Sequence, residues 1–452
     1  LAVEPWLPVA TGTGVSRRVS LRDALLSGRD IAGLAAPYAV QNVALLRLLL
    51  ALAHRVYGPA DMAAWRLLWD QGLDPDLLDR YLEQHLSAFD ASVFMQYEQT
   101  DAAYPAPVAR LAPYRSEADG CTWRPWEPMN EDPMLLLIAA QAAGPGGYGL
   151  GRVVTWGGPL SHVAGYYLQG ADLLETLLLN LPPYINLPGD LPSWEGVSGA
   201  PGRLAGYTER SKPVRLFGNQ VLYLTGVTRP GRQDVDPMLC YRPVKGELSP
   251  LPPARSRPMW AQVETLLRLH AKDYAPPAAL TWVSQLVLAD VLPRSARYRL
   301  RMSGIFGKQA LVEGYTESGV ALPGAVLADE DLCDYAIEAV SSADTAAKHT
   351  ANAVRILAIF DEGGKSGRKL RQRLQELRHS LLAETYWAPL TAAWDVLLAE
   401  LPADPDAALD KWRRAVRRQA LAAYEAIMAV YHIPMRQEVD GWTKLRKSLS
   451  NV

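Results

Sequence analysis

The strongest constraint on the fold is a change in the character of the chain after Pro323. From Asp329 onward proline and glycine are sparse, and apolar residues recur at intervals of three and four, as at Leu409, Trp412 and Val416. This spacing places apolar side chains along one stripe of an α-helix, and the stripe must be buried against another element. Helices of this kind predict a helical bundle. Their expected ranges are 329–360, 366–399, 405–432 and, for a shorter helix, 437–449.

The chain before this point mixes two other patterns. Helical spacing of apolar residues runs through 40–57, whereas alternation typical of strands runs through 221–225 and 238–242. We therefore expect an α+β fold, with a large mixed α/β N-terminal domain at 1–325 followed by a C-terminal four-helix bundle at 326–452. Further helices are expected at 61–70, 75–89, 171–180, 259–270 and 278–291, a helix or buried strand at 134–143, and loop at 104–133.

Composition limits the location and the partners of the chain. Its 452 residues are 49% hydrophobic and 21% charged, and the formal net charge of −2 gives no overall attraction to nucleic acid. The three cysteines are far apart, which disfavours a disulfide framework and indicates a reducing, cytoplasmic location. No run reaches the roughly 20 apolar residues of a membrane span. The longest, at 43–53, is interrupted by Arg47 and predicts a buried helix, so no membrane partner is expected.

Glycines are concentrated in one short stretch, at 144–151. Such a cluster carries an entropic cost, so the backbone there must adopt unusual angles or approach another backbone or a ligand closely. Three of the glycines also have the G-x-G-x-x-G spacing of a dinucleotide-binding turn. The glycines of the stretch are Gly144, Gly146, Gly147, Gly149 and Gly151.

The segment after the stretch argues against a nucleotide cofactor. A dinucleotide-binding turn opens a helix, but 152–156 is rich in β-branched residues and runs into Gly157, Gly158 and Pro159. No G-x-S-x-G or H-E-x-x-H motif occurs, and the seven histidines are scattered. We therefore expect no cofactor, no metal and no catalytic residue. An enzyme that binds a nucleotide cofactor on the glycine stretch stays as the alternative.

Basic residues form local clusters in spite of the net charge. Arg414, Arg417 and Arg418 share a face at helical spacing, and this face is either solvated or a surface that follows phosphates. If it is only solvated, the chain would be a helical scaffold that binds protein partners alone. A second cluster contains Arg210, Lys212 and Arg215.

Several segments, in order along the chain, match one known family. They include Trp6-Leu7-Pro8-Val9, the helix at 44–55, the glycine stretch within 141–159, and Met302-Ser303-Gly304-Ile305-Phe306-Gly307-Lys308-Gln309-Ala310. Together they resemble the large subunit of the type I-E CRISPR surveillance complex Cascade, the CasA family. The resemblance spans nearly the whole chain. Each motif alone is weak, and the order and spacing of the set make it specific.

This resemblance implies a DNA-binding subunit without catalytic activity. Its implied partners are double-stranded target DNA, the other Cascade subunits with their guide RNA, and a helicase–nuclease effector that acts in antiviral defence. The family recognises the short PAM element of the target from the minor groove, which is about 6 Å wide and admits only slender groups. It then opens the duplex beside the PAM, and unstacking one base step costs a few kcal/mol.

The resemblance also assigns residues to this work. The glycines of the stretch would form the loop that enters the minor groove. The segment at 302–310 carries the family's glutamine wedge, which implies Gln309, flanked by Lys308 and Ala310. The family places a lysine near the PAM, for which Lys212 is the first candidate; Arg215 and Arg210 are the other basic candidates of that region.

Overall fold

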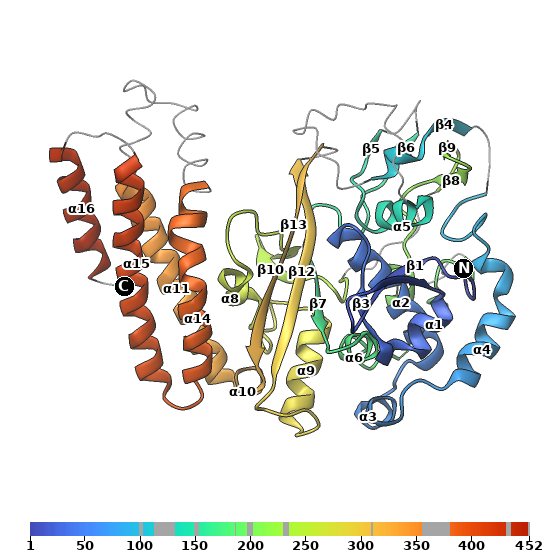
Figure 1. Cartoon of the computed structure of the whole chain (residues 1–452), viewed down its shortest axis with the longest axis horizontal. Helices are drawn as coiled ribbons and strands as arrows, with labels where there is room; N and C mark the ends of the chain where they lie inside the picture. The colour runs from blue at the N-terminus through green and yellow to red at the C-terminus, as the bar shows by residue number, and fades with distance from the viewer. Residues whose placement is uncertain are drawn as a thin grey trace. The chain divides into compact units, whose positions relative to one another are not determined.

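A computed structural model shows a chain of mixed helices and strands (Figure 1). Contacts between Cα atoms divide it into two compact units. The first comprises 1–253, 273–286 and 298–317, and the second 254–272, 287–297 and 318–452. The structure describes residues 1–98, 103–112, 132–148, 153–185, 187–196, 202–228, 235–308, 311–354, 380–430 and 435–450.

The helices and strands have the following bounds. The helices are α1 (Leu21–Leu26), α2 (Ala39–Tyr57), α3 (Met62–Gln71), α4 (Pro75–Gln84), α5 (Pro133–Ala143), α6 (Leu173–Leu179), α7 (Arg203–Tyr207), α8 (Val263–Leu266), α9 (Ala278–Leu288), α10 (Gly324–Leu327), α11 (Glu330–Ala353), α14 (Ala388–Glu400), α15 (Pro405–Val430) and α16 (Met435–Leu449). The strands are β1 (Leu7–Thr11), β2 (Ser16–Val19), β3 (Ile31–Leu34), β4 (Ala103–Pro107), β5 (Gly147–Tyr148), β6 (Val154–Thr155), β7 (Gly165–Gln169), β8 (Val214–Phe217), β9 (Gln220–Leu224), β10 (Tyr241–Val244), β11 (Glu247–Pro250), β12 (Arg297–Lys308) and β13 (Leu311–Pro323).

Helix α2 is the core helix of the first unit and packs against α5, α6 and α7. Among the described helices it is the one long and apolar enough to cross a membrane, but 78% of its apolar window is buried inside the protein. The expectation of a buried helix there is confirmed. Arg47 is fully buried because its guanidinium donates two hydrogen bonds to the carboxylate of Asp236, at 3.0 and 2.7 Å. A buried charge of this kind requires such a partner.

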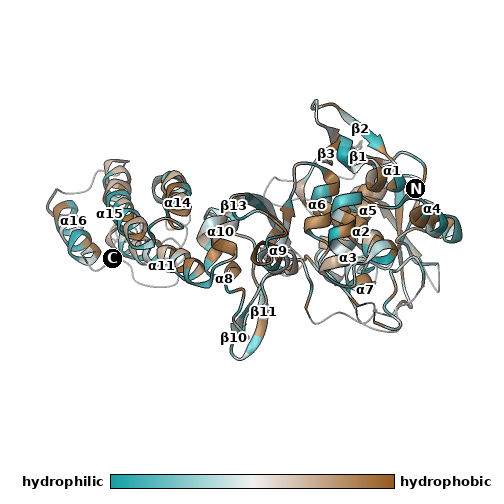
Figure 2. Cartoon of the chain, turned by 90° about the horizontal axis from the view of Figure 1, so that it is seen from below, coloured by the Kyte–Doolittle hydropathy of each residue, from teal (hydrophilic) through white to brown (hydrophobic). Residues whose placement is uncertain are grey.

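Short antiparallel sheets surround this core, with strand orders β2-β1-β3, β4-β9-β8 and β13-β12-β7. The hairpin β10–β11 stands apart from these sheets and projects from the first unit in Figure 2. Strand β4 falls in a region expected to be loop. Its two prolines, Pro105 and Pro107, argue against a strand in the sequence. They are tolerated in the structure because β4 is an edge strand.

Two further strand assignments differ from the sequence pattern. Residues 238–240 are not a strand, because a turn at 237–238 precedes β10: Asp236 accepts the amide of Met238 on its carboxylate and that of Leu239 on its carbonyl oxygen. The long β12–β13 hairpin was not expected. Glycines at 304, 307 and 314 weaken its strand pattern. Gly304 is required by packing, because a Cβ there would lie 2.7 Å from the carbonyl oxygen of Val163.

The second unit is dominated by α11, α14, α15 and α16. Asp329 caps α11 by accepting the amide of Leu332, and three tryptophans form the centre of the core. The ring centroid of Trp260 lies 5.2 Å from Trp394 and 5.5 Å from Trp412. Mixed helices and strands followed by C-terminal helices confirm the predicted fold class. The domain boundary at 325/326 stays a prediction, and the expected start of a helix at 366 lies outside the described residues.

Candidate nucleic-acid interface

The glycine stretch follows α5 and forms one arm of a small hairpin. Strand β5 pairs with β6, with Gly147 opposite Thr155. The arms also meet below the strands, where the amide of Gly158 donates to the carbonyl of Gly144 at 3.0 Å. Residues 153–158 are thus strand and loop, not the helix that a dinucleotide-binding turn requires. Gly149 and Gly151 lie outside the described residues.

Close packing explains three of the described glycines: the facing arm crowds Gly146, the end of α5 crowds Gly158, and α5 with Lys212 crowds Gly144. A Cβ on Gly146 would lie 2.7 Å from the amide nitrogen of Gly157, and one on Gly158 would lie 2.4 Å from the carbonyl oxygen of Ala142. A Cβ on Gly144 would lie 2.6 Å from both Ala140 O and Lys212 Cε. Gly147 has φ of +157°, which L-residues rarely adopt. The first arm, from Gly144 to Gly147, therefore presents backbone with little side-chain bulk, whereas the second arm carries Val154 and Trp156.

Lys212 holds the base of this hairpin. Its side chain is buried, and its ammonium donates to the carbonyls of Gly144 at 3.1 Å, Pro145 at 2.7 Å and Trp156. The first two carbonyls belong to one arm and the third to the other, so one cation joins both arms. In this structure Lys212 acts on the hairpin itself, and it would influence a ligand through the position of the loop.

Gln141, on the last turn of α5, fixes Lys212 in turn. Its side-chain amide donates to the carbonyls of Met95 and Lys212, both at 3.0 Å, and its oxygen accepts the amide of Lys212 at 2.6 Å. Ser211 donates to the carbonyl of Gln141 at 2.7 Å and accepts the amide of Trp156 on its own carbonyl at 3.1 Å. The sequence signal for Gln141 was a single amide in an otherwise apolar helix.

The two arginines beside Lys212 differ in their availability. Arg210 donates to the carbonyl of Gln96 at 2.7 Å and lies over the ring of Tyr97, 4.4 Å from its centroid. Burial lowers the pKa of Arg210. Arg215 lies on β8, is half-exposed, and has no ion-pair or hydrogen-bond partner among the described residues. Of this cluster, Arg215 is the cation available to an external anion.

The segment expected to carry the wedge is connected to the glycine hairpin through the pairing of β7 with β12. Strand β12 ends at Lys308 and β13 begins at Leu311, so Gln309 and Ala310 lie between two paired strands and outside the described residues, as does the side chain of Lys308. The chain runs from the glycine hairpin into β7, which pairs with β12, and Ser303 stands opposite Gly165. In Figure 1 the β5–β6 hairpin and the Lys308 end of β12 are both at the upper side.

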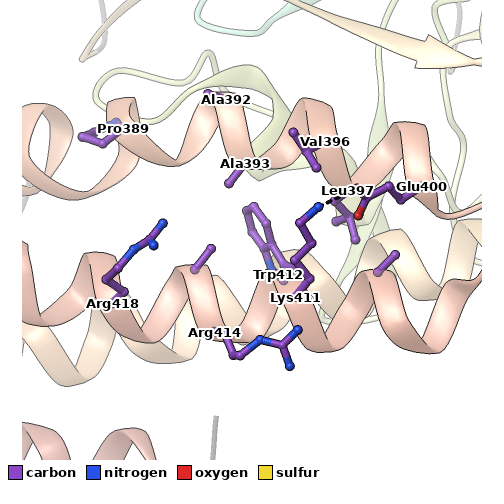
Figure 3. A pocket seen from close by; sticks show the side chains of 12 residues that line it. Pro389, Ala392, Ala393, Val396, Leu397, Glu400, Lys411, Trp412, Arg414 and Arg418 are labelled. Atoms are coloured by element: carbon purple, nitrogen blue, oxygen red, sulfur yellow. Dashed lines mark hydrogen bonds and ion pairs between the residues drawn. The ribbon is translucent and has the colours of Figure 1, made fainter.

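The bundle arginines do not all face the same way. Arg414 and Arg418 line a groove of about 630 Å³ between α14 and α15 (Figure 3). Arg417 does not line this groove, and its Nε is buried without a hydrogen-bond partner in the described structure. Lys411 also lines the groove but is paired with Glu400 across it. Within the described part of the chain, the free cations of the rim are thus Arg414 and Arg418, above a floor that includes Ala392, Ala393, Val396 and Trp412.

The described residues offer little acid–base or metal chemistry. Among them, no group of three histidine, cysteine or acidic side chains is placed to hold a metal ion. Burial raises the pKa of the Cys240 and Cys333 thiols to about 12, so neither thiol is a ready nucleophile at neutral pH. What the site provides is bare backbone, a held loop and a few exposed cations.

Comparison with known proteins identifies the class. The profile of the CRISPR-associated protein Cse1 family matches residues 1–423. A CasA/Cse1 protein of Thermus thermophilus is 29% identical over 94% of this chain and 91% of its own length. A solved structure of Thermus thermophilus CasA superposes with a TM-score of 0.81, at 26% identity over 100% of this chain and 99% of that one. A chain of a structure titled "CRISPR RNA-guided surveillance complex" has the same fold, with a TM-score of 0.76, 21% identity and 99% coverage of both chains.

This chain belongs to the CRISPR-associated Cse1 family. The recognition of the large subunit of a CRISPR surveillance complex from the sequence is thereby confirmed. The fold extends over nearly the full length of the solved CasA chain.

Proposed function

We propose that this subunit recognises the PAM of double-stranded target DNA from the minor groove, opens the duplex beside it, and brings a helicase–nuclease to the opened target. The observation that carries the proposal is the glycine hairpin, whose first arm from Gly144 to Gly147 is slender and which Lys212 joins to the second arm through three carbonyls. Binding energy is not then lost in ordering the arm. Backbone amides can meet base acceptors in a groove too narrow for most side chains.

The proposed wedge at Gln309 is supported by the pairing of β12 with β7. The connection between two long paired strands can press into the duplex without folding back, and Gln309 follows the last residue of β12 in the sequence. Its amide has both a donor and an acceptor for the base edges that unpairing leaves free. In this proposal the subunit needs no catalytic group, guide RNA in the other subunits reads the sequence, and the complex works in the cytoplasm.

The test compares a paired target with one already opened. The assembled RNA-guided complex is titrated with duplex DNA that carries the PAM, and with the same duplex unpaired next to the PAM. We expect Gln309→Ala to weaken binding of the paired duplex about ten- to a hundredfold, because a few kcal/mol of unstacking is no longer offset. Binding of the opened duplex should change little.

The exposed glutamine Gln71 on α3 supplies a matched control, and Gln71→Ala should behave as wild type on both targets. Equal losses on both targets for Gln309→Ala, or no loss on either, would contradict a wedge. If binding did not depend on the PAM even in the wild-type complex, the proposed PAM recognition itself would fail.

A further inference from the structure

The sheet β4-β9-β8 has one buried face and one open face. In its register Arg215 stands opposite Leu222 and Phe217 opposite Gln220, so these side chains share a face. The other face carries Val214 and Val221, whose side chains are fully buried. The three-stranded sheet is thus anchored by one side, and the second side is turned to solvent.

Phe217 is the most unusual residue of the open face. It is 71% exposed at the end of β8, next to a two-residue turn in which Gly218 has φ of +57°. A tight turn of this kind holds the ring at the tip of a paired hairpin rather than on a loose loop. An aromatic ring left in water has no folding benefit, and in proteins that bind single strands such rings serve as stacking surfaces for bases.

Polar groups suited to a nucleotide flank this ring. Arg215 precedes it by two residues on the same face and has no ion-pair partner among the described residues, so its guanidinium is available to a phosphate. Gln220, opposite the ring in the register, is exposed and offers an amide to a base edge. A nucleotide offers a phosphate to the guanidinium, a base edge to the amide and a flat face to the ring, so single-stranded nucleic acid can satisfy all three groups at once.

We propose that Phe217, Arg215 and Gln220 form a stacking platform for an unpaired base of single-stranded DNA. The inference rests on the proposed function, because opening the duplex supplies unpaired bases. It also rests on continuity of the chain: Lys212, which holds the glycine hairpin, is two residues from the start of β8. The platform would hold a base released beside the PAM and so oppose reclosure of the duplex.

The test uses the full chain and a DNA strand of about 12 nucleotides, within the range of single-strand binding sites, that contains the fluorescent base 2-aminopurine. Stacking on Phe217 should quench the fluorescence. Phe217→Ala should abolish the quenching and weaken binding about five- to a hundredfold, whereas Phe217→Tyr should keep both, because every aromatic ring supplies the stacking face. Arg215→Ala should keep the quenching and make the dependence of log K on log salt shallower by about 0.7.

Phe217→Leu separates stacking from apolar docking, since leucine keeps apolar area but has no ring. Wild-type binding of the DNA strand by this variant would overturn the platform, because the strand would then bind without an aromatic ring. No binding of the DNA strand by the wild-type chain, or binding only of RNA of the same sequence, would also overturn it. PAM-dependent binding of duplex by the complex is measured separately, so the platform can fail while the proposed function stands.

Discussion

At the scale of single residues, His54 shows what burial does to a titratable group. It lies at the end of α2, fully buried, and its ring is stacked near Tyr207 with centroids 5.9 Å apart. Neither ring nitrogen has a hydrogen-bond partner in the described structure. Burial, with a smaller effect from the charge of Arg203, lowers the pKa of His54 well below its usual value. The folded protein therefore keeps this imidazole neutral.

In the unfolded chain His54 is exposed to water and regains its ordinary pKa, and this difference determines how stability depends on pH. Below about pH 6.5 the unfolded state binds a proton at His54 that the folded state refuses, so stability falls as pH falls, by at most about 1.4 kcal/mol per pH unit. We expect His54→Phe to remove this loss between about pH 7 and about pH 5, on either side of the ordinary histidine pKa. Urea unfolding at both pH values measures it, with the exposed His270→Gln as control. A loss that is the same in wild type and His54→Phe would contradict the assignment.

The sequence made Lys212 and the glycines candidates, but it did not predict how they meet. The three carbonyls that Lys212 contacts lie 56 to 68 residues away in the chain, and local spacing does not encode such contacts. The buried role of Arg210 depends in the same way on Tyr97. Arg215 is accessible to a ligand because side chains alternate along β8, so that it lies on the face opposite to the buried Val214.

At the scale of elements, the glycine hairpin depends on contact between two backbones. We expect Gly146→Ala to push its arms apart, because the new Cβ would lie 2.7 Å from the amide nitrogen of Gly157. Binding of PAM-containing duplex by the assembled complex should fall about tenfold or more, equivalent to at least about 1.4 kcal/mol. Global stability should fall by less than about 2 kcal/mol, since only a small hairpin is distorted.

Gly33→Ala on β3 is the matched control, because a Cβ there meets nothing within 4 Å. It should bind the duplex as wild type does, with binding followed by titration and stability by thermal unfolding. Wild-type binding by Gly146→Ala would show that the position of the arm does not govern recognition.

Long helices were predicted well and several strands poorly, because a helix repeats its apolar spacing many times. Helices α2, α11 and α15 repeat their apolar spacing over many turns, so the pattern survives individual exceptions such as Arg47. Strand β4 has five residues, two of them prolines, and β12 is interrupted by glycines, of which Gly304 is required by packing. Such strands exist because their partners pair with them, and β9, the partner of β4, and β7, one partner of β12, lie far away in the sequence.

At the scale of the whole molecule, a net charge of −2 conceals separate basic sites. In the second unit the exposed cations Arg414 and Arg418 line the groove between α14 and α15 without ion-pair partners among the described residues. If they follow phosphates, each contributes to the release of counterions on binding. If they are only solvated, reversing their charge changes the net charge of the subunit but removes no contact with a phosphate.

Reversal of both charges distinguishes these cases. We expect Arg414→Glu with Arg418→Glu to weaken target binding by the assembled complex and to make the slope of log K against log salt shallower by about 2, because each phosphate contact on duplex DNA contributes roughly 0.9. Lys444→Glu with Lys447→Glu, both exposed on α16, changes the net charge equally. Equal slopes in the two double variants would assign the arginines to a solvated face, whereas a shallower slope in the first alone places phosphate contacts at this groove.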